Sequence, residues 1–153
     1  MGTRVLSLVA VFTLALVAAQ LKVSPGDLDA RRLLVRLLLD AGSRSEAEAL
    51  LVEGQAMSPQ STDLARSLAA LQTERKAFMP ALETLQKSLK YAQMDGAYLA
   101  FMAAQYQRLG QHVQASELLA QALEISPGNG LWQLALAVSR KALGNVSGAR
   151  ECA

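Results

Sequence analysis

The sequence predicts an all-α fold, an α-solenoid of antiparallel helix pairs with three full repeats and a partial fourth. The first observation is a set of residues that cap helix N-termini, spaced 34 positions apart: Asp27, Ser61, Asp95 and Asn129. The second is an alanine that recurs at the same interval: Ala47, Ala81, Ala115 and Ala149. A 34-residue interval holds two helices and their turns, so each helix pair is expected to repeat the one before it.

Each repeat is expected to turn sharply between its two helices. The turn positions, again 34 residues apart, hold Gly42, Lys76, Gly110 and Gly144. Glycine adopts a left-handed backbone without steric cost, whereas a side chain at Lys76 is expected to cost about 1 kcal/mol. The second repeat is therefore predicted to be the least stable part of the solenoid.

The helices follow in order from these markers. The first helix of the first repeat is expected over residues 28–41, and the second begins after Ser43, which has capping-box spacing to Glu46. A helix from Gly130 to Leu143 opens the fourth repeat, and Asn145 is expected to cap a final helix. The second helices share a stripe of small, large and small residues: Ala47, Leu51, Gly54; Ala81, Leu85, Ser88; Ala115, Leu119, Ala122. Such a stripe lets a neighbouring helix approach closely, so these residues are predicted to form the core.

Residues 1–22 have the composition of a signal peptide or an N-terminal membrane anchor, which leaves residues 23–153 as the repeat domain. One positive charge precedes an apolar run from Val5 to Val17, and small residues at Ala18 and Ala19 suit cleavage before Gln20. A different interpretation follows from Pro25, which is in register with the later turn prolines of the repeats. In that case residues 8–21 form the second helix of a half repeat, packed against the first full repeat.

The spacing and residue types resemble the tetratricopeptide repeat, whose pattern is W-x2-L-G-x2-Y, then A-x3-F, then P. The leucine place of that pattern holds Leu34, Leu68, Met102 and Leu136. Tyr106 keeps the tyrosine, and the tryptophan place of the first repeat holds Arg31. The resemblance runs from Leu28 to the end of the chain. It implies that the first helices of successive repeats line a concave groove that holds a peptide or a helix.

Transferring that groove onto this sequence gives the candidate peptide-binding residues: Arg32, Arg36, Arg66, Phe101, Arg108, Leu134 and Lys141. The three N-terminal arginines could pair with carboxylates of a partner through bidentate hydrogen bonds. Alternatively, they lie on a solvated helix face and pair with the nearby Asp29 and Asp63. The aromatic residues Tyr98, Tyr106 and Trp132 are expected to fill gaps between repeats rather than to bind a ligand.

Nothing in the sequence predicts an enzyme, a cofactor or a metal site. The lone histidine, His112, has no second histidine or cysteine nearby and is expected at the surface. The lone cysteine, Cys152, cannot form an internal disulfide. Lys plus Arg exceed Asp plus Glu by only 15 to 13, without a basic run, which argues against nucleic acid as a partner.

Residues 103–116 and 127–145 resemble the repeat region of the biogenesis protein of mannose-sensitive haemagglutinin type IV pili. This resemblance implies a scaffold for a bacterial envelope machine, such as a type IV pilus or a secretion system, in the periplasm or anchored in the inner membrane. The alternative is a soluble, cytoplasmic adaptor that binds an acidic peptide tail in its groove. The apolar C-terminal end, with Trp132 and Leu134, is expected to dock onto a partner, which could be a second copy.

Overall fold

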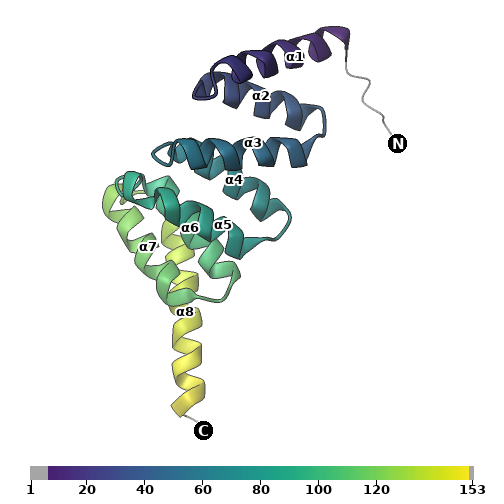
Figure 1. Ribbon diagram of the computed structural model, residues 1–153. Helices are drawn as coiled ribbons and strands as arrows, with labels where there is room; N and C mark the ends of the chain where they lie inside the picture. Colours follow the sequence, from purple (N-terminus) through teal and green to yellow (C-terminus); the bar gives the residue numbers. More distant parts are fainter. Residues whose placement is uncertain (1–6, 152–153) are drawn as a thin grey trace. The chain divides into compact units, whose positions relative to one another are not determined.

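The computed structural model describes residues 7–151, and within this range the chain is helical, without a β-strand (Figure 1). The elements are α1 Leu8–Val23, α2 Leu28–Asp40, α3 Arg44–Met57, α4 Thr62–Glu74, α5 Phe78–Ser88, the short 3-10 helix η1 Leu89–Tyr91, α6 Gly96–Arg108, α7 His112–Ile125 and α8 Gly130–Glu151. The chain divides into two compact units, one that ends at Leu71 and one that begins at Gln72. The predicted all-α class is confirmed.

The three turns that join the helices of a pair have the same geometry. Gly42, Lys76 and Gly110 have positive φ angles of 81°, 61° and 72°. In each turn the next amide donates a hydrogen bond back to a carbonyl near the end of the first helix: Ser43 N to Leu38 O at 2.8 Å, Ala77 N to Gln72 O at 2.8 Å and Gln111 N to Tyr106 O at 2.9 Å. This is the Schellman pattern. The left-handed backbone predicted at Lys76 is confirmed.

Replacing Lys76 with glycine is expected to raise the free energy of unfolding by about 0.5–1 kcal/mol, because glycine relieves the left-handed strain but loses more backbone entropy on folding. Urea unfolding followed by circular dichroism measures the change. The matched control is Arg75→Gly at the preceding position, which has no positive φ and should gain nothing. An Lys76→Gly protein no more stable than the parent would contradict the strain assigned to this turn.

Side-chain capping was predicted correctly at three of the four N-cap positions. Asp27 accepts a hydrogen bond from Ala30 N at 2.9 Å, and Asp95 accepts one from Tyr98 N at 3.0 Å. Asn129 does the same for Trp132 N at 3.2 Å. The prediction was wrong at Ser61, whose Oγ is buried and makes no hydrogen bond.

The capping box predicted at Ser43 is also absent. Ser43 has no side-chain hydrogen bond to the first turn of α3, although the helix begins there as expected. Its backbone has φ −82° and ψ 60°, because its amide closes the preceding turn on Leu38. An N-cap side chain normally needs extended backbone, as at Asp27, to reach the amides of the first turn.

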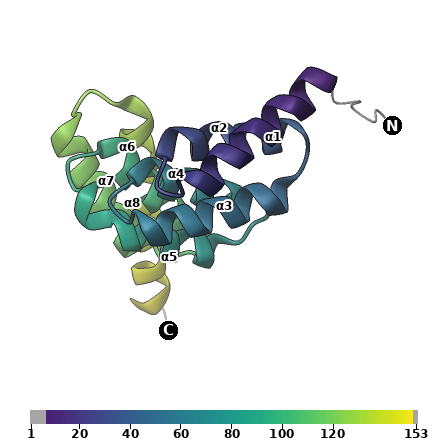
Figure 2. The same cartoon turned by 45° about the horizontal axis from the view of Figure 1, so that its top comes forward.

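The fourth repeat departs from the sequence prediction. No turn forms at Gly144, and α8 continues from Gly130 to Glu151, so Asn145 does not begin a new helix. Figures 1 and 2 show the last turns of α8 running beyond α6 and α7. In the first three repeats a leucine anchors the second helix, but the corresponding position here is Ala153. A second helix without that anchor has little to gain from folding back onto the first.

The predicted core stripes are confirmed. The alanines and leucines of the stripes on α3, α5 and α7 are at most 2% exposed: Ala47, Leu51, Ala81, Leu85, Ala115, Leu119 and Ala122. The remaining stripe residues, Gly54 and Ser88, are buried as well. In the unit that ends at Leu71, the stripe of α3 packs into a cluster with leucines of α2 and α4.

The N-terminal helix α1 packs on α2. Leu21 is buried, and Leu14, Val17 and Ala18 pack against the same core as the α2 leucines. Figure 2 shows α1 lying beside α2 within this unit. Shifted by one and three repeat lengths, the bounds of α3 and α7 both fall on residues 10–23, so α1 stands in the register of a second helix. Among the described residues, no helix combines the length and apolarity required to cross a bilayer.

Candidate functional site

The predicted groove residues of the first unit lie on exposed faces of α2 and α4. Arg32 is 42% exposed and pairs with two carboxylates, at 3.0 Å from Asp29 and 3.3 Å from Asp63. The second of these ion pairs joins α2 to α4. Arg36 and Arg66 are exposed. The surface therefore carries alternating charge rather than an isolated basic patch, and Arg32 is engaged as the alternative interpretation of the sequence predicted.

The predicted residues of the second unit give a more apolar surface. Phe101 is half-buried on α6, and Leu134 is 63% exposed on α8. Arg108 is exposed and lies over the ring of Phe78, with 5.4 Å between the guanidinium carbon and the ring centroid. Lys141 is exposed on α8. Binding by these residues remains a prediction, since the structure contains no ligand that reports on it.

The aromatic residues of the second unit lie in its interior, as predicted. Tyr98 is fully buried, and its hydroxyl donates a 2.7 Å hydrogen bond to the carbonyl of Leu85. Tyr106 and Trp132 are half-buried and pack against the core cluster of α6, α7 and α8. Trp132 covers Gly96, where an added Cβ would lie 2.9 Å from the indole ring. A small residue at position 96 therefore lets the indole pack directly on α6.

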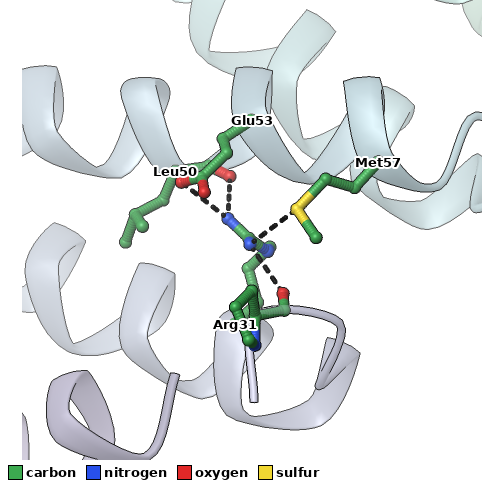
Figure 3. A network of polar contacts seen from close by, with 5 residues as sticks. Arg31, Leu50, Glu53 and Met57 are labelled. Atoms are coloured by element: carbon green, nitrogen blue, oxygen red, sulfur yellow. Dashed lines mark hydrogen bonds and ion pairs between the residues drawn. The ribbon is translucent and has the colours of Figure 1, made fainter. Parts of the chain in front are cut away.

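Sequence reasoning missed the most heavily bonded side chain of the first unit, the buried Arg31. It is 1% exposed and occupies the place of the tryptophan in the repeat pattern. One terminal nitrogen donates to the carbonyl of Leu50 at 2.8 Å and to the carboxylate of Glu53 at 3.3 Å. The other donates to the carbonyl of Pro25 at 2.9 Å and to the sulfur of Met57 at 3.6 Å (Figure 3). One guanidinium thus ties α2 to α3 and to the turn before α2.

Gly54 explains how an arginine fits at this place. A Cβ added at Gly54 would lie 2.4 Å from the Cδ of Arg31 and 3.0 Å from its Nε. The aliphatic stem of Arg31 therefore crosses α3 directly over the glycine. The signal that could have revealed this pairing is a coincidence of two departures, an arginine at the aromatic place and a glycine in a helix interior.

A shallow groove of about 340 Å³ lies between α1 and the α2–α3 pair. Its walls are mostly apolar side chains, including Leu14, Ala18 and Leu50, and the carboxylates of Glu46 and Glu53 lie among its lining residues. Glu53 is already paired with Arg31. The groove is large enough for an apolar side chain of a partner.

In the second unit, Gln107 joins two first helices. Its Nε2 donates to the carbonyl of Ala135 and to the hydroxyl of Ser139, both at 2.8 Å. Ser139 is fully buried, so these bonds hold α6 and α8 in a fixed register.

No grouping of His, Cys, Asp or Glu suited to a metal ion occurs among the residues that the structure describes. His112 is half-buried rather than at the surface as predicted, and its Nδ1 is buried without a hydrogen bond. The cause is its place at the start of α7, which packs tightly on α6. Cys152 and residues 1–6 lie outside the described residues.

Solved structures with this arrangement of helices identify the fold. A tetratricopeptide repeat protein from Parabacteroides merdae ATCC 43184 superposes with a TM-score of 0.76 at 18% identity, over 89% of this chain and 54% of its own. A crystal structure of MamA matches with a TM-score of 0.74 at 17% identity, over 86% of this chain and 77% of its own. The fold is a tetratricopeptide-repeat solenoid.

A second MamA structure, the RS-1 ArsTM double mutant, matches with a TM-score of 0.74 at 15% identity, over 93% of this chain and 80% of its own. At these identities the likeness concerns the fold. No family model matches the sequence, and no curated protein matches it. The resemblance to pilus biogenesis proteins therefore remains a prediction, whereas the tetratricopeptide-repeat fold is established.

Proposed function

We propose that this chain is a protein–protein interaction scaffold whose working surface is the exposed face of its first helices. This surface, called the first-helix face, comprises the predicted groove residues on α2, α4, α6 and α8. One observation carries the proposal: the repeat buries its stripe on the second helices and leaves the same face of each first helix open. An array of like faces suits an extended partner better than a small molecule.

The two units offer this partner different chemistry. On α2 and α4, Arg32 is held by Asp29 and Asp63, so a partner carboxylate must compete with existing ion pairs. On α6 and α8, Phe101 and Leu134 offer apolar contacts with little competing charge. The apolar half is therefore expected to supply most of the affinity, since exposed ion pairs contribute about 0–1 kcal/mol each. Capture of an acidic tail by Arg32, Arg36 and Arg66 is the weaker candidate.

Site-specific photo-crosslinking in cells tests the first-helix face. A photoreactive residue at Leu134 or at Phe101 is expected to trap the same partner. The matched control is Val52, which is 51% exposed on the second helix α3 and should trap nothing in common with them. Crosslinks that are equally strong from Val52 and from the first-helix face would contradict the proposal.

Affinity measurements with the partner identified in this way separate the two halves of the face. Leu134→Asp is expected to weaken binding at least tenfold, because it places a charge in the apolar contact. The triple variant Arg32→Ala, Arg36→Ala, Arg66→Ala is expected to weaken binding less than threefold. A larger effect of the arginine variant, together with strong salt dependence, would instead favour the acidic-tail adaptor.

We also propose that the scaffold serves a bacterial envelope machine such as a type IV pilus or a secretion system. The support comes from the composition of residues 1–22 and from the resemblance noted in the sequence. Cell fractionation with intact-mass measurement of the native protein tests it. Cleavage after Ala19, or recovery with membranes, would support an envelope location, and an intact protein in the cytoplasmic fraction would contradict it.

A further inference from the structure

The helix α1 has the register of a second helix but lacks a first helix of its own. The stripe positions of α3 and α7 correspond to Thr13, Val17 and Gln20 on α1. Thr13 and Val17 are half-buried and Gln20 is exposed, whereas the corresponding residues of α3 and α7 are buried. Leu16 is 57% exposed, although its counterparts Leu50 and Leu118 both pack against core clusters. One side of α1 is therefore left uncovered.

The outer face of α1 is also more apolar than that of the other second helices. Phe12 is 67% exposed, whereas the same register position holds Glu46 on α3 and Gln114 on α7. Leu8 and Val9 are 89% and 75% exposed. An uncharged, aromatic surface of this kind is expected to be covered by another protein segment or by lipid.

The opposite defect occurs at α8, which has the register of a first helix and lacks a second helix. The hydrogen bonds of Arg31 to α3 show which register position faces the second helix of the same repeat. Three first-helix positions along this side are largely buried in α2 and α6: Arg31, Val35 and Leu38, then Leu99, Ala103 and Tyr106. Their counterparts on α8 are all exposed: Gln133, Ala137 and Arg140.

The contacts inside the second unit show how two such ends fit together. There α7 packs between α6, the first helix of its own repeat, and α8, the first helix of the next. At the N-terminal end, α1 already packs on the next first helix, α2, and only the helix in the place of α6 is missing. The exposed side of α8 is a helix of that type.

We propose that copies of this chain associate head to tail, with α8 of one copy docking on α1 of the next and completing a repeat across the junction. The first helices on the two sides of the junction also match. Ala100 and Ala135 pack in one cluster in the second unit, and their register counterparts at the junction are Leu134 and Leu33. These leucines are 63% and 41% exposed, so the junction would bury two large apolar side chains.

A second copy fits these observations better than an unrelated helix, because each defect is the complement of the other and both use the 34-residue register. The two surfaces are different, so the contact is heterologous and does not close on itself as a symmetric dimer does. Mean mass is therefore expected to grow continuously with protein concentration. This inference does not depend on which partner the first-helix face binds.

Sedimentation of three single variants of the full chain tests the proposal. Leu16→Glu blocks the α1 end and Ala137→Glu blocks the α8 end, and neither residue belongs to the proposed first-helix face. Val113→Glu is the matched control, because Val113 is 52% exposed on the outer side of α7, away from both ends of the repeat array. The parent and Val113→Glu proteins are expected to polymerise, and both end variants are expected to be monomers, with helical circular dichroism preserved.

Mixing the two end variants gives the decisive result. Each retains one intact end, so an equimolar mixture is expected to form a 1:1 dimer and nothing larger. A parent protein that is monomeric at every concentration, or a mixture that stays monomeric while the parent associates, would overturn the proposal. So would a native N-terminus at Gln20, since cleavage there removes most of α1.

A phosphatidylcholine vesicle assay decides whether lipid covers α1 instead. If the parent and Ala137→Glu proteins float with vesicles as monomers and Leu16→Glu does not, the uncovered side of α1 is a membrane-binding surface and the self-association proposal is wrong. If none of the three proteins floats while the parent polymerises, the head-to-tail contact is supported.

Discussion

Replacing Arg31 with alanine is expected to lower the free energy of unfolding by about 3 kcal/mol, because buried carbonyls lose their donors and a long packed stem is removed. The carbonyls of Leu50 and Pro25 both accept hydrogen bonds from this side chain. The carboxylate of Glu53 is 57% exposed and can return to water, so it adds little to the loss. Urea unfolding followed by circular dichroism measures the change.

Two further variants separate the roles of the guanidinium and the stem. Arg31→Met keeps most of the stem and should cost about 2 kcal/mol, the penalty for the unpaired carbonyls. Gly54→Ala should destabilise the parent protein, because the added Cβ would clash with the Cδ of Arg31. In the Arg31→Ala background the same substitution should be neutral or stabilising. Additive effects of the two changes would show that the glycine and the arginine are not coupled.

The second large effect is expected in the other unit, at Leu119. This leucine is 2% exposed at the centre of the α7 stripe, where it packs with Ala103 of α6 and Leu136 of α8. Leu119→Ala is expected to cost about 3 kcal/mol, since it removes buried methyl groups and leaves a cavity between three helices. The fall in the urea midpoint measures the loss.

The comparison variant for Leu119 is Leu131→Ala on α8. Leu131 is 78% exposed, so its truncation is expected to change stability by less than about 0.5 kcal/mol. Equal losses from the two variants would contradict the packing of the α7 stripe. A larger loss at Leu131 would indicate that the exposed face of α8 is covered in solution.

The repeat architecture was predictable because it rests on spacing. Intervals of 34 residues located the turns at Gly42, Lys76 and Gly110, and all three adopt the left-handed backbone that the spacing implied. The stripe residues were predictable for the same reason, since a side chain that repeats in register meets the same neighbours in every repeat. Leu51 and Leu119 are buried alike.

The departures from the predictions arise where local and tertiary demands compete. Ser43 closes a turn and therefore cannot also cap a helix, which its residue type alone does not reveal. The failed turn at Gly144 depends on the absence of an anchoring leucine for a later helix, a long-range effect. Arg31 was missed because a charged residue in a helix ordinarily indicates an exposed face, and its partners lie up to 26 positions away.

The candidate binding site was predictable only in outline. Register placed Arg32 and Leu134 on exposed faces of first helices, and both are exposed there. The pairing of Arg32 with Asp63 joins residues 31 positions apart and depends on side-chain rotamers that spacing does not fix. Which of these residues a partner contacts is decided by the chemistry of the partner, about which a single sequence carries little information.

The uniform interval between Asp27 and Asn129 makes the length of this array adjustable in whole steps. A tandem duplication or excision of 34 residues, cut at the N-caps, keeps every later side chain in phase with its neighbours. Loss of a single residue inside a helix instead rotates the following residues by about 100° and turns the alanine–leucine stripe toward water. The chain can thus lengthen or shorten by modules, while frame errors within a helix disrupt the interior.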